Sequence, residues 1–316
     1  MHKIAVIFPG QGSQYIGMGK YFYDNFKESR EIFEKANDIL KYDLSNKIFN
    51  GTMDELSETK VTQPSILTVT MAILNALNSM CNIGVKTYCT AGLSLGEYSA
   101  LVYSGILDFH QAIPLVEKRS KHMVDSLESE GQYGMSAVLG LSEDKIIKVI
   151  NSVKEIGNIE IANYNCPGQI VVSGDAKALD EADKLFVEEG AKRSIRLAVK
   201  APFHSSFLKN AAKNFEIDLK NVKFGNTFNI PVISNVTAKE MKQDQIVSLL
   251  SKQIMSSVLW EKSILKMIEM GVDTFIEIGP GKTLTGFLKK INNSVSVFNI
   301  EDEVSLNKSV NFLSEV

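Results

Sequence analysis

Residues 85–98, VKTYCTAGLSLGEY, decide the fold of this 316-residue chain. The run from Val85 to Ala91 predicts a strand, and the residues after Gly96 predict a helix. Between them, Gly92-Leu93-Ser94-Leu95-Gly96 matches GxSxG, a tight strand-to-helix turn that exposes a serine hydroxyl. The start of the following helix would place N–H donors and a favourable dipole beside that hydroxyl. The pattern indicates a candidate nucleophile, Ser94.

The turn alone leaves two interpretations open: a catalytic serine or a glycine-lined structural turn. A serine hydroxyl is a poor nucleophile without a base, and the chain has only four histidines, His2, His110, His122 and His204. His204 follows a predicted strand and lies in a turn, where functional histidines often sit. His2 is terminal, and the other two fall in a predicted helix. By elimination His204 is the best candidate base, although a lone turn histidine is more often structural.

Outward from this turn, strands and helices alternate in both outer portions of the chain. Residues 3–8, 231–234 and 274–278 predict strands, and residues 64–80 and 245–268 predict mainly helical segments. A further helix is expected from Asp108 through Arg119 and His122 to about Leu127, with Pro114 indicating a kink or a later start. This alternation is typical of an α/β protein whose mainly parallel sheet is covered on both faces.

Residues 130–199 show a different order. Met135 to Leu139 predicts a strand, Glu143 to Val153 a helix, and residues 159–162 and 170–173 two strands. A helix from Ala176 and a strand from Arg193 to Val199 complete a β-α-β-β-α-β order, which is the ferredoxin-like arrangement. We therefore expect a small subdomain at 130–199, inserted into a larger body formed by residues 1–129 and 200–316.

Composition excludes several classes of function. The net charge is −3 without a long basic tract, so nucleic-acid binding has no electrostatic support. The longest apolar runs are strand-length and too short to cross a membrane. The three cysteines, Cys81, Cys89 and Cys166, fit neither a disulfide framework nor a zinc site, and favour a reducing cytoplasm. A Walker phosphate loop at 279–283 would need glycine where Ile276 stands.

A series of short motifs runs along nearly the whole chain. They are Gly10-Gln11-Gly12-Ser13-Gln14, Gln63-Pro64-Ser65, the 92–98 segment, Arg119 with Met123, Asn165-Cys166-Pro167-Gly168-Gln169, Pro202-Phe203-His204-Ser205, Ser234-Asn235-Val236-Thr237, Gln253 with Trp260, and Glu277-Ile278-Gly279-Pro280-Gly281. In this order they resemble the malonyl-CoA:acyl-carrier-protein transacylase family, which includes acyltransferases of polyketide synthases. The resemblance implies an α/β-hydrolase-like body with a ferredoxin-like insert, in agreement with the pattern described above.

The resemblance also implies roles for individual residues. Ser94 would carry the acyl group as an ester, and His204 would act as its base. A main-chain carbonyl near Gln253 would orient the imidazole, so no catalytic aspartate is required. The positions of Gln11 and Leu95 match those whose backbone N–H groups form the oxyanion hole. One such donor is worth about 3 kcal/mol in other enzymes.

Substrate binding would depend on Arg119, Gln253 and Phe203. Arg119 matches the arginine that binds the malonyl carboxylate, and a guanidinium fork suits that group because it offers two parallel donors. Without the flanking motif, Arg119 would be taken for a solvated helix residue. Phe203, next to the base, matches the bulky choice that goes with malonyl rather than branched extender units. The chain departs from the usual motifs at Leu93, where histidine is commonest, and at Ser257, where proline is usual.

The implied substrates are malonyl-CoA and an acyl carrier protein, with no metal and no bound cofactor. Carrier proteins are strongly acidic, so a local basic surface is expected. The candidates are Lys192 and Arg193 on the insert, and Lys289 and Lys290 on the last helix of the body. Ordinary solvated charges explain them equally well. We expect a monomer. Two other functions stay open: a serine thioesterase or hydrolase with the same nucleophile, and a non-catalytic module that docks carrier protein.

Overall fold

The computed structural model describes residues 2–127, 132–199 and 201–315. The elements of the first and last portions of the chain are β1 (Ile4–Phe8), α1 (Lys20–Asn25), α2 (Lys27–Leu40), α3 (Leu44–Asn50), α4 (Met53–Ser57), α5 (Thr59–Met80), η1 (Ile83–Lys86), β2 (Thr87–Gly92), α6 (Gly96–Tyr103), α7 (Phe109–Asp125), η2 (Ser206–Leu208), α10 (Lys209–Lys220), η3 (Gln243–Gln245), α11 (Ile246–Met255), α12 (Trp260–Glu269), β7 (Thr274–Ile278), α13 (Thr283–Ile291), β8 (Ser296–Ile300) and α14 (Glu303–Glu315). The middle portion contributes β3 (Tyr133–Leu139), α8 (Glu143–Ser152), β4 (Ile159–Cys166), β5 (Gln169–Asp175), α9 (Ala176–Glu188) and β6 (Arg193–Arg196).

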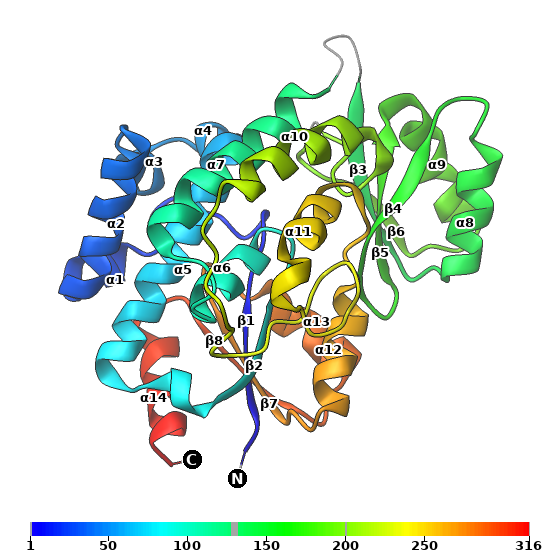
Figure 1. Ribbon diagram of the computed structural model, residues 1–316. Helices are drawn as coiled ribbons and strands as arrows, with labels where there is room; N and C mark the ends of the chain where they lie inside the picture. Colours follow the sequence, from blue (N-terminus) through cyan, green and yellow to red (C-terminus); the bar gives the residue numbers. More distant parts are fainter. Residues whose placement is uncertain (1, 128–131, 200, 316) are drawn as a thin grey trace.

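The larger part of the molecule is built on a parallel sheet with strand order β2-β1-β7-β8 (Figure 1). Strand β1 is completely buried, which explains its uninterrupted apolar sequence. Ile4, Val6 and Phe8 pack into the core formed with α5 and α7, whereas Ala5 and Ile7 pack into the core formed with α12 and α13. Helices thus cover both faces of the sheet, and the predicted α/β class is confirmed.

The middle portion forms a second sheet with order β4-β5-β3-β6, in which every pairing is antiparallel. Helices α8 and α9 lie on its outer side in Figure 1 and share an apolar core with it. The order β-α-β-β-α-β confirms the predicted ferredoxin-like arrangement. The division into a body of 1–129 and 200–316 and an insert of 130–199 stays a prediction, and its junction residues 129, 130 and 200 lie outside the described residues.

A short segment between α11 and α12 connects the two sheets. Val258 donates its N–H to the Ala162 carbonyl at 2.8 Å and accepts from the Tyr164 N–H at 2.9 Å, so it pairs with β4. The Ser257 hydroxyl donates to the Ile161 carbonyl at 2.6 Å. Serine at this position therefore supplies a hydrogen bond to the second sheet, which the usual proline of the family could not do through its side chain.

Several local expectations need correction. Residues 231–234 form isolated bridges, from Val232 to Thr90 and from Ile233 to Glu240, rather than a regular strand. The stretch 245–268 is divided into α11 and α12. Helix α7 begins at Phe109 despite Pro114, because the Asp108 side chain accepts the His110 N–H at 2.7 Å and starts the helix.

Two elements at the end of the chain were not expected from the sequence. Strand β8 lies at the edge of the parallel sheet and is only partly buried, so its apolar pattern is weak. Helix α14 follows it and buries Leu306 and Leu313. Helix α13, which carries Lys289 and Lys290, is consequently not the last helix of the body, which corrects that expectation.

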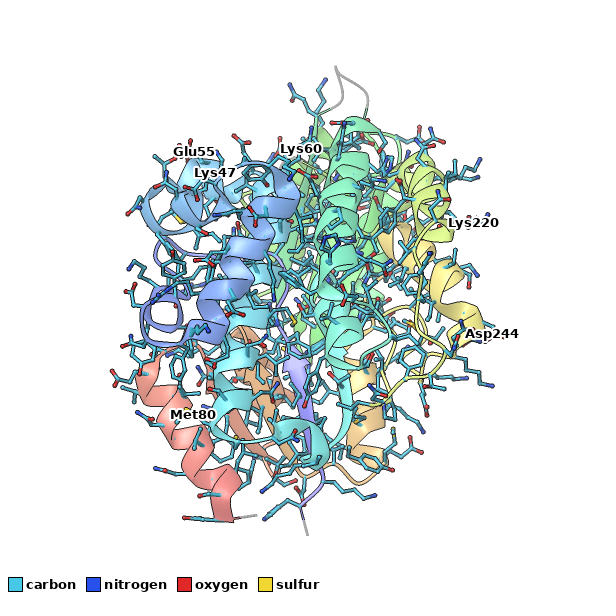
Figure 2. The ribbon with its side chains drawn as sticks, turned by 60° about the vertical axis from the view of Figure 1, so that its left-hand side comes forward. Lys47, Glu55, Lys60, Met80, Lys220 and Asp244 are labelled. Carbon is cyan, nitrogen blue, oxygen red and sulfur yellow. The ribbon has the colours of Figure 1, made fainter. Side chains whose placement is uncertain are left out.

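Charged side chains of both signs cover the surface shown in Figure 2. Lys47 and Glu55 face each other there at a nitrogen–oxygen distance of 4.0 Å, and the exposed Met80 lies toward the other end of the molecule. In the part of the chain that the structure describes, no helix combines the length and the hydrophobicity needed to cross a membrane.

Candidate active site

The segment from β2 to α6 makes a sharp turn that holds Ser94 at its tip. Ser94 has a φ of 53°, in the left-handed region that non-glycine residues rarely adopt. A Cβ at Gly92 would lie 1.9 Å from the main chain of Gly96, and one at Gly96 would lie 2.2 Å from the Phe8 carbonyl oxygen. Both positions therefore require glycine. The Asn235 side chain accepts the Ser94 N–H at 2.7 Å and fixes the turn from outside.

Ser94 and His204 lie in direct hydrogen-bond contact. The Ser94 Oγ is 2.7 Å from His204 Nε2, and His204 Nδ1 is 2.8 Å from the Gln253 main-chain oxygen. A carbonyl only accepts, so Nδ1 carries the proton and Nε2 is free to accept from the serine. Burial, and then the charge of Arg119, lower the pKa of His204 to about 4. The imidazole is thus a neutral base. The His204 backbone has a φ of 59°, so His204, like Ser94, is in the strained left-handed region.

Arg119 enters the site from α7 and is completely buried. Its Nη1 donates to Gln63 Oε1 at 2.7 Å. Its Nη2 donates to Gln253 Oε1 at 3.0 Å and to Ser94 Oγ at 3.2 Å. The guanidinium also lies 5.4 Å from the centre of the Tyr98 ring. The arginine is therefore not a solvated helix residue but a buried cation held within bonding distance of the nucleophile.

A buried carboxylate lies beneath the turn. Glu97, in the first turn of α6, has no exposed surface. It accepts the Asn235 N–H at 2.7 Å and forms a short hydrogen bond with the Gln253 side-chain amide. Burial raises the pKa of Glu97 to about 7, although these bonds and Arg119 oppose the rise. Glu97, Asn235 and Gln63 received no role from the sequence, although each lies in one of the motifs on which the family resemblance rests.

A cavity of about 240 Å³ opens above Ser94 and His204. Its lining is mainly apolar and comes from the second sheet and from turns and helices of the larger part of the molecule. Met135 and Val171 of the second sheet and Leu93 of the turn contribute to it. Phe203, whose exposure is 6%, also contributes to the wall. The leucine that replaces the common histidine thus adds apolar surface to the cavity.

The two expected oxyanion-hole residues lie close to the nucleophile in the fold. Leu95 follows Ser94 directly, and Gln11 lines the same cavity as Ser94. Neither backbone N–H donates to any partner among the residues that the structure describes. The Gln11 side chain itself is held elsewhere, donating to Thr59 Oγ1 at 3.4 Å.

The expected docking residues are exposed. They are Lys192, Arg193, Lys289 and Lys290. The Lys192 stem lies against Gly140, whose N–H bonds the Gly168 carbonyl in the β4–β5 turn. On the other side, burial raises the pKa of the Cys166 thiol and the nearby Lys290 ammonium partly offsets that rise. Lys192 and Lys290 therefore approach the same turn from different elements.

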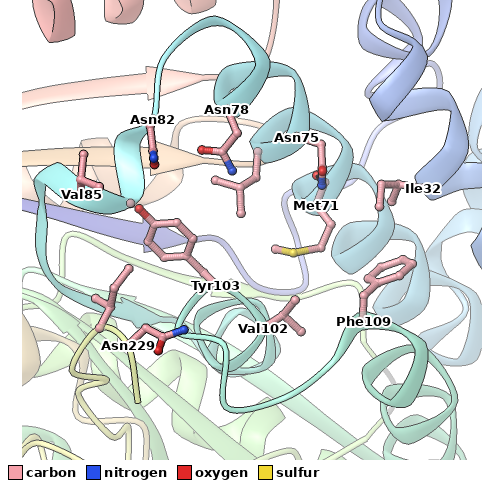
Figure 3. A pocket seen from close by; sticks show the side chains of 13 residues that line it. Ile32, Met71, Asn75, Asn78, Asn82, Val85, Val102, Tyr103, Phe109 and Asn229 are labelled. Carbon is pink, nitrogen blue, oxygen red and sulfur yellow. Dashed lines mark hydrogen bonds between the residues drawn. The ribbon is translucent and has the colours of Figure 1, made fainter. Parts of the chain in front are cut away.

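A second cavity, of about 500 Å³, lies away from this site near the amino end of β2 (Figure 3). Asn75, Asn78, Asn82 and Asn229 line it together with apolar side chains and Tyr103. The Tyr103 hydroxyl is bonded to Thr87 Oγ1 at 2.6 Å, and burial raises its pKa. Among the described residues that line this cavity, no nucleophile is paired with a base. Among the described residues, no group of three His, Cys, Asp or Glu side chains could hold a metal ion.

Known proteins resemble this chain over nearly its whole length. The family model of the acyl transferase domain matches residues 6–309. A malonyl CoA-acyl carrier protein transacylase of Bacillus subtilis (strain 168) is 42% identical, over 100% of this chain and 98% of the relative.

Solved structures agree. The malonyl CoA-acyl carrier protein transacylase of Clostridium perfringens superposes with a TM-score of 0.92 at 46% identity, covering 99% of this chain and 98% of that one. A malonyl-transacylase in complex with a type II PKS acyl-carrier protein gives 0.94 at 36% identity, covering 98% and 99%. The chain therefore belongs to the malonyl CoA-acyl carrier protein transacylase family, within the acyl transferase domain family.

Proposed function

We propose that this protein transfers a malonyl group from malonyl-CoA to the phosphopantetheine thiol of an acyl carrier protein, in fatty acid or polyketide synthesis, through an ester on Ser94. The observation that carries the proposal is the buried Arg119 guanidinium, 3.2 Å from the Ser94 hydroxyl. A cation placed there suits an acyl group that ends in a carboxylate. Relatives of this family at about 40% identity support the same substrate class.

In the first half-reaction, His204 Nε2 takes the proton of the Ser94 hydroxyl while Oγ attacks the thioester carbonyl. The backbone N–H groups of Gln11 and Leu95 stabilise the resulting oxyanion. When the tetrahedral intermediate collapses, the carbon–sulfur bond breaks and the imidazolium protonates the departing coenzyme A thiolate. The malonyl ester of Ser94 and a neutral His204 remain.

The second half-reaction runs the same steps with a new nucleophile. His204 removes the proton of the carrier thiol, whose sulfur attacks the ester carbonyl. The serine oxygen then leaves and recovers its proton from the imidazolium. The Gln253 carbonyl stabilises the imidazolium through Nδ1 in both halves, at 2.8 Å in the resting site. A dyad with a carbonyl partner is sufficient because no third residue must change protonation.

Selectivity follows from two walls of the site. Arg119 forms a forked bond with the malonyl carboxylate, and an acetyl group would leave that cation without its anion. Phe203 occupies space next to the base and restricts a branch at the acyl α-carbon. The acidic carrier protein docks at the basic side chains around the β4–β5 turn. The enzyme acts as a monomer in the cytoplasm, with malonyl-CoA as substrate and no bound cofactor.

Intact-protein mass spectrometry with malonyl-CoA alone tests the proposal. We expect an added malonyl mass that is absent in Ser94→Ala, and transfer of that mass to carrier protein when it is added. Rapid release of free malonate without an adduct would instead identify a hydrolase. Absence of both adduct and malonate would identify a non-catalytic docking module. Either of the last two results would overturn the transferase.

A further inference from the structure

The reaction described above makes no use of Glu97, although its carboxylate is completely buried beneath the nucleophile. A buried carboxylate is costly unless hydrogen bonds and a nearby cation compensate it. Here Glu97 accepts the Asn235 N–H at 2.7 Å through one oxygen and bonds the Gln253 amide through the other. Its position in the first turn of α6 adds the helix dipole.

Glu97 determines which way the Gln253 amide faces. The Gln253 Nε2 donates to the Glu97 carboxylate and to the Ser94 main-chain oxygen, the latter at 2.9 Å, so both of its protons are used. Its Oε1 must therefore face the other way, where it accepts from Arg119 Nη2 at 3.0 Å. The main-chain oxygen of the same residue holds His204. Gln253 thus contacts the base, the nucleophile's backbone and the arginine together.

We infer that Glu97 is a positioning residue for acyl selection: by fixing the amide of Gln253, it directs the Arg119 guanidinium toward Ser94 and so favours acyl groups that carry a carboxylate. The inference rests on the proposed function. When a donor replaces the Glu97 oxygen that faces Gln253, the Gln253 amide can reverse. The NH₂ group of Gln253 would then face the Arg119 guanidinium, so two hydrogen-bond donors would oppose each other. Arg119 Nη2 would move away from its present position beside Ser94 Oγ.

Glu97 also reaches the nucleophile by a second path. Glu97 accepts the main-chain N–H of Asn235 at 2.7 Å. The side chain of Asn235 in turn holds the turn, because it accepts the Ser94 N–H and donates to the Gly92 carbonyl, each at 2.7 Å. Damage along this path would displace the serine and slow every acyl group alike. Damage through Gln253 and Arg119 would slow malonyl transfer more than acetyl transfer. The ratio of the two rates therefore separates positioning of the arginine from support of the turn.

The test is Glu97→Gln, an isostere that places a donor where one acceptor stood. Loading of Ser94 from malonyl-CoA and from acetyl-CoA is followed by intact mass, with Tm measured in parallel. We expect the malonyl-to-acetyl rate ratio to fall about tenfold or more. Glu277→Gln is the matched control, because Glu277 is equally buried and accepts two backbone N–H groups, from Leu284 and Thr285. We expect that control to leave the ratio within about twofold of the wild type.

A double-mutant cycle with Gln253→Met, which keeps the main-chain carbonyl, completes the experiment. If Glu97 acts through the amide, Gln253→Met lowers the ratio by itself and Glu97→Gln adds nothing in that background. A wild-type ratio in Glu97→Gln, or equal losses for both acyl groups, would overturn the inference. Should Glu97→Gln not fold, a wild-type ratio in Gln253→Met would overturn it equally. Failure of the wild type to form any adduct would instead refute the proposed function.

Discussion

Replacing Arg119 by alanine removes the only charged group that lies within hydrogen-bond distance of the Ser94 hydroxyl among the described residues. A forked bond to a malonyl carboxylate comprises two charge-assisted hydrogen bonds, each worth about 1.5–3 kcal/mol. Their combined loss corresponds to about 10²- to 10⁴-fold in kcat/KM for malonyl-CoA. Acetyl-CoA makes neither bond, so we expect its kcat/KM to change by less than about tenfold.

The same substitution also affects the free energy of unfolding. In the resting site Arg119 satisfies Oε1 of Gln63 and of Gln253, and each buried oxygen left without a donor costs about 1–3 kcal/mol. Removal of a buried cation offsets part of this loss. Arg119→Met keeps more of the packing against Tyr98, and we expect it to separate selectivity from stability.

The assay compares kcat/KM for malonyl-CoA and acetyl-CoA with saturating carrier protein, after Tm has shown that each variant is folded. Arg196→Ala serves as control, because that arginine pairs with Asp180 and Asp183 on the second sheet. An unchanged malonyl-to-acetyl ratio in both Arg119 variants would remove the carboxylate clamp from the mechanism.

Two pH-dependent properties follow from the buried groups. Because the pKa of His204 is lowered to about 4, the base stays neutral at higher pH; we expect the rate of Ser94 acylation to stay level from pH 8 to about 5. A stopped-flow profile that falls with a midpoint near the ordinary imidazole value of 6.5 would contradict this. Burial raises the pKa of Glu277 from 4.5 to about 7, so its contribution to stability is fully present below 4.5 and is lost as pH rises through 7. Relative to wild type, Glu277→Gln should therefore gain stability in chemical denaturation as pH rises from about 5 to 8; a constant difference would show that Glu277 does not titrate in this range.

The sequence was sufficient for the parts of the site that depend on local structure. GxSxG between a strand and a helix predicted where Ser94 would lie, since the turn is set by glycine sterics over five residues. The choice of His204 required only elimination among few histidines. Without the family motifs, Arg119 would be taken for a solvated helix residue, because it stands in the charged run from Glu117 to Arg119. Val116 and Met123, three residues before it and four after it, lie on the same buried face of the helix.

What the sequence could not predict depends on contacts between distant segments. Glu97 and Gln253 are separated by 156 positions, and their hydrogen bond exists only after α6 and α11 have packed. The same holds for residues 231–234, where bridges to Thr90 and Glu240 replace the expected strand. Strand β8 was missed because it lies at the edge of the sheet and only Ile300 in it is buried, which leaves a weak apolar pattern.

The segment between α11 and α12 has a practical consequence for exchanging parts between enzymes. Gln253, whose carbonyl orients the imidazole, precedes Val258 by a few residues, and Val258 is paired with the second sheet. The main chain thus links the orientation of His204, the proposed base, to the pairing of Val258 with the second sheet. A chimaera that imports residues 130–199 from a relative must reproduce the backbone pairing at Ala162 and Tyr164, or its base will lose alignment while every side chain of the dyad remains in the sequence.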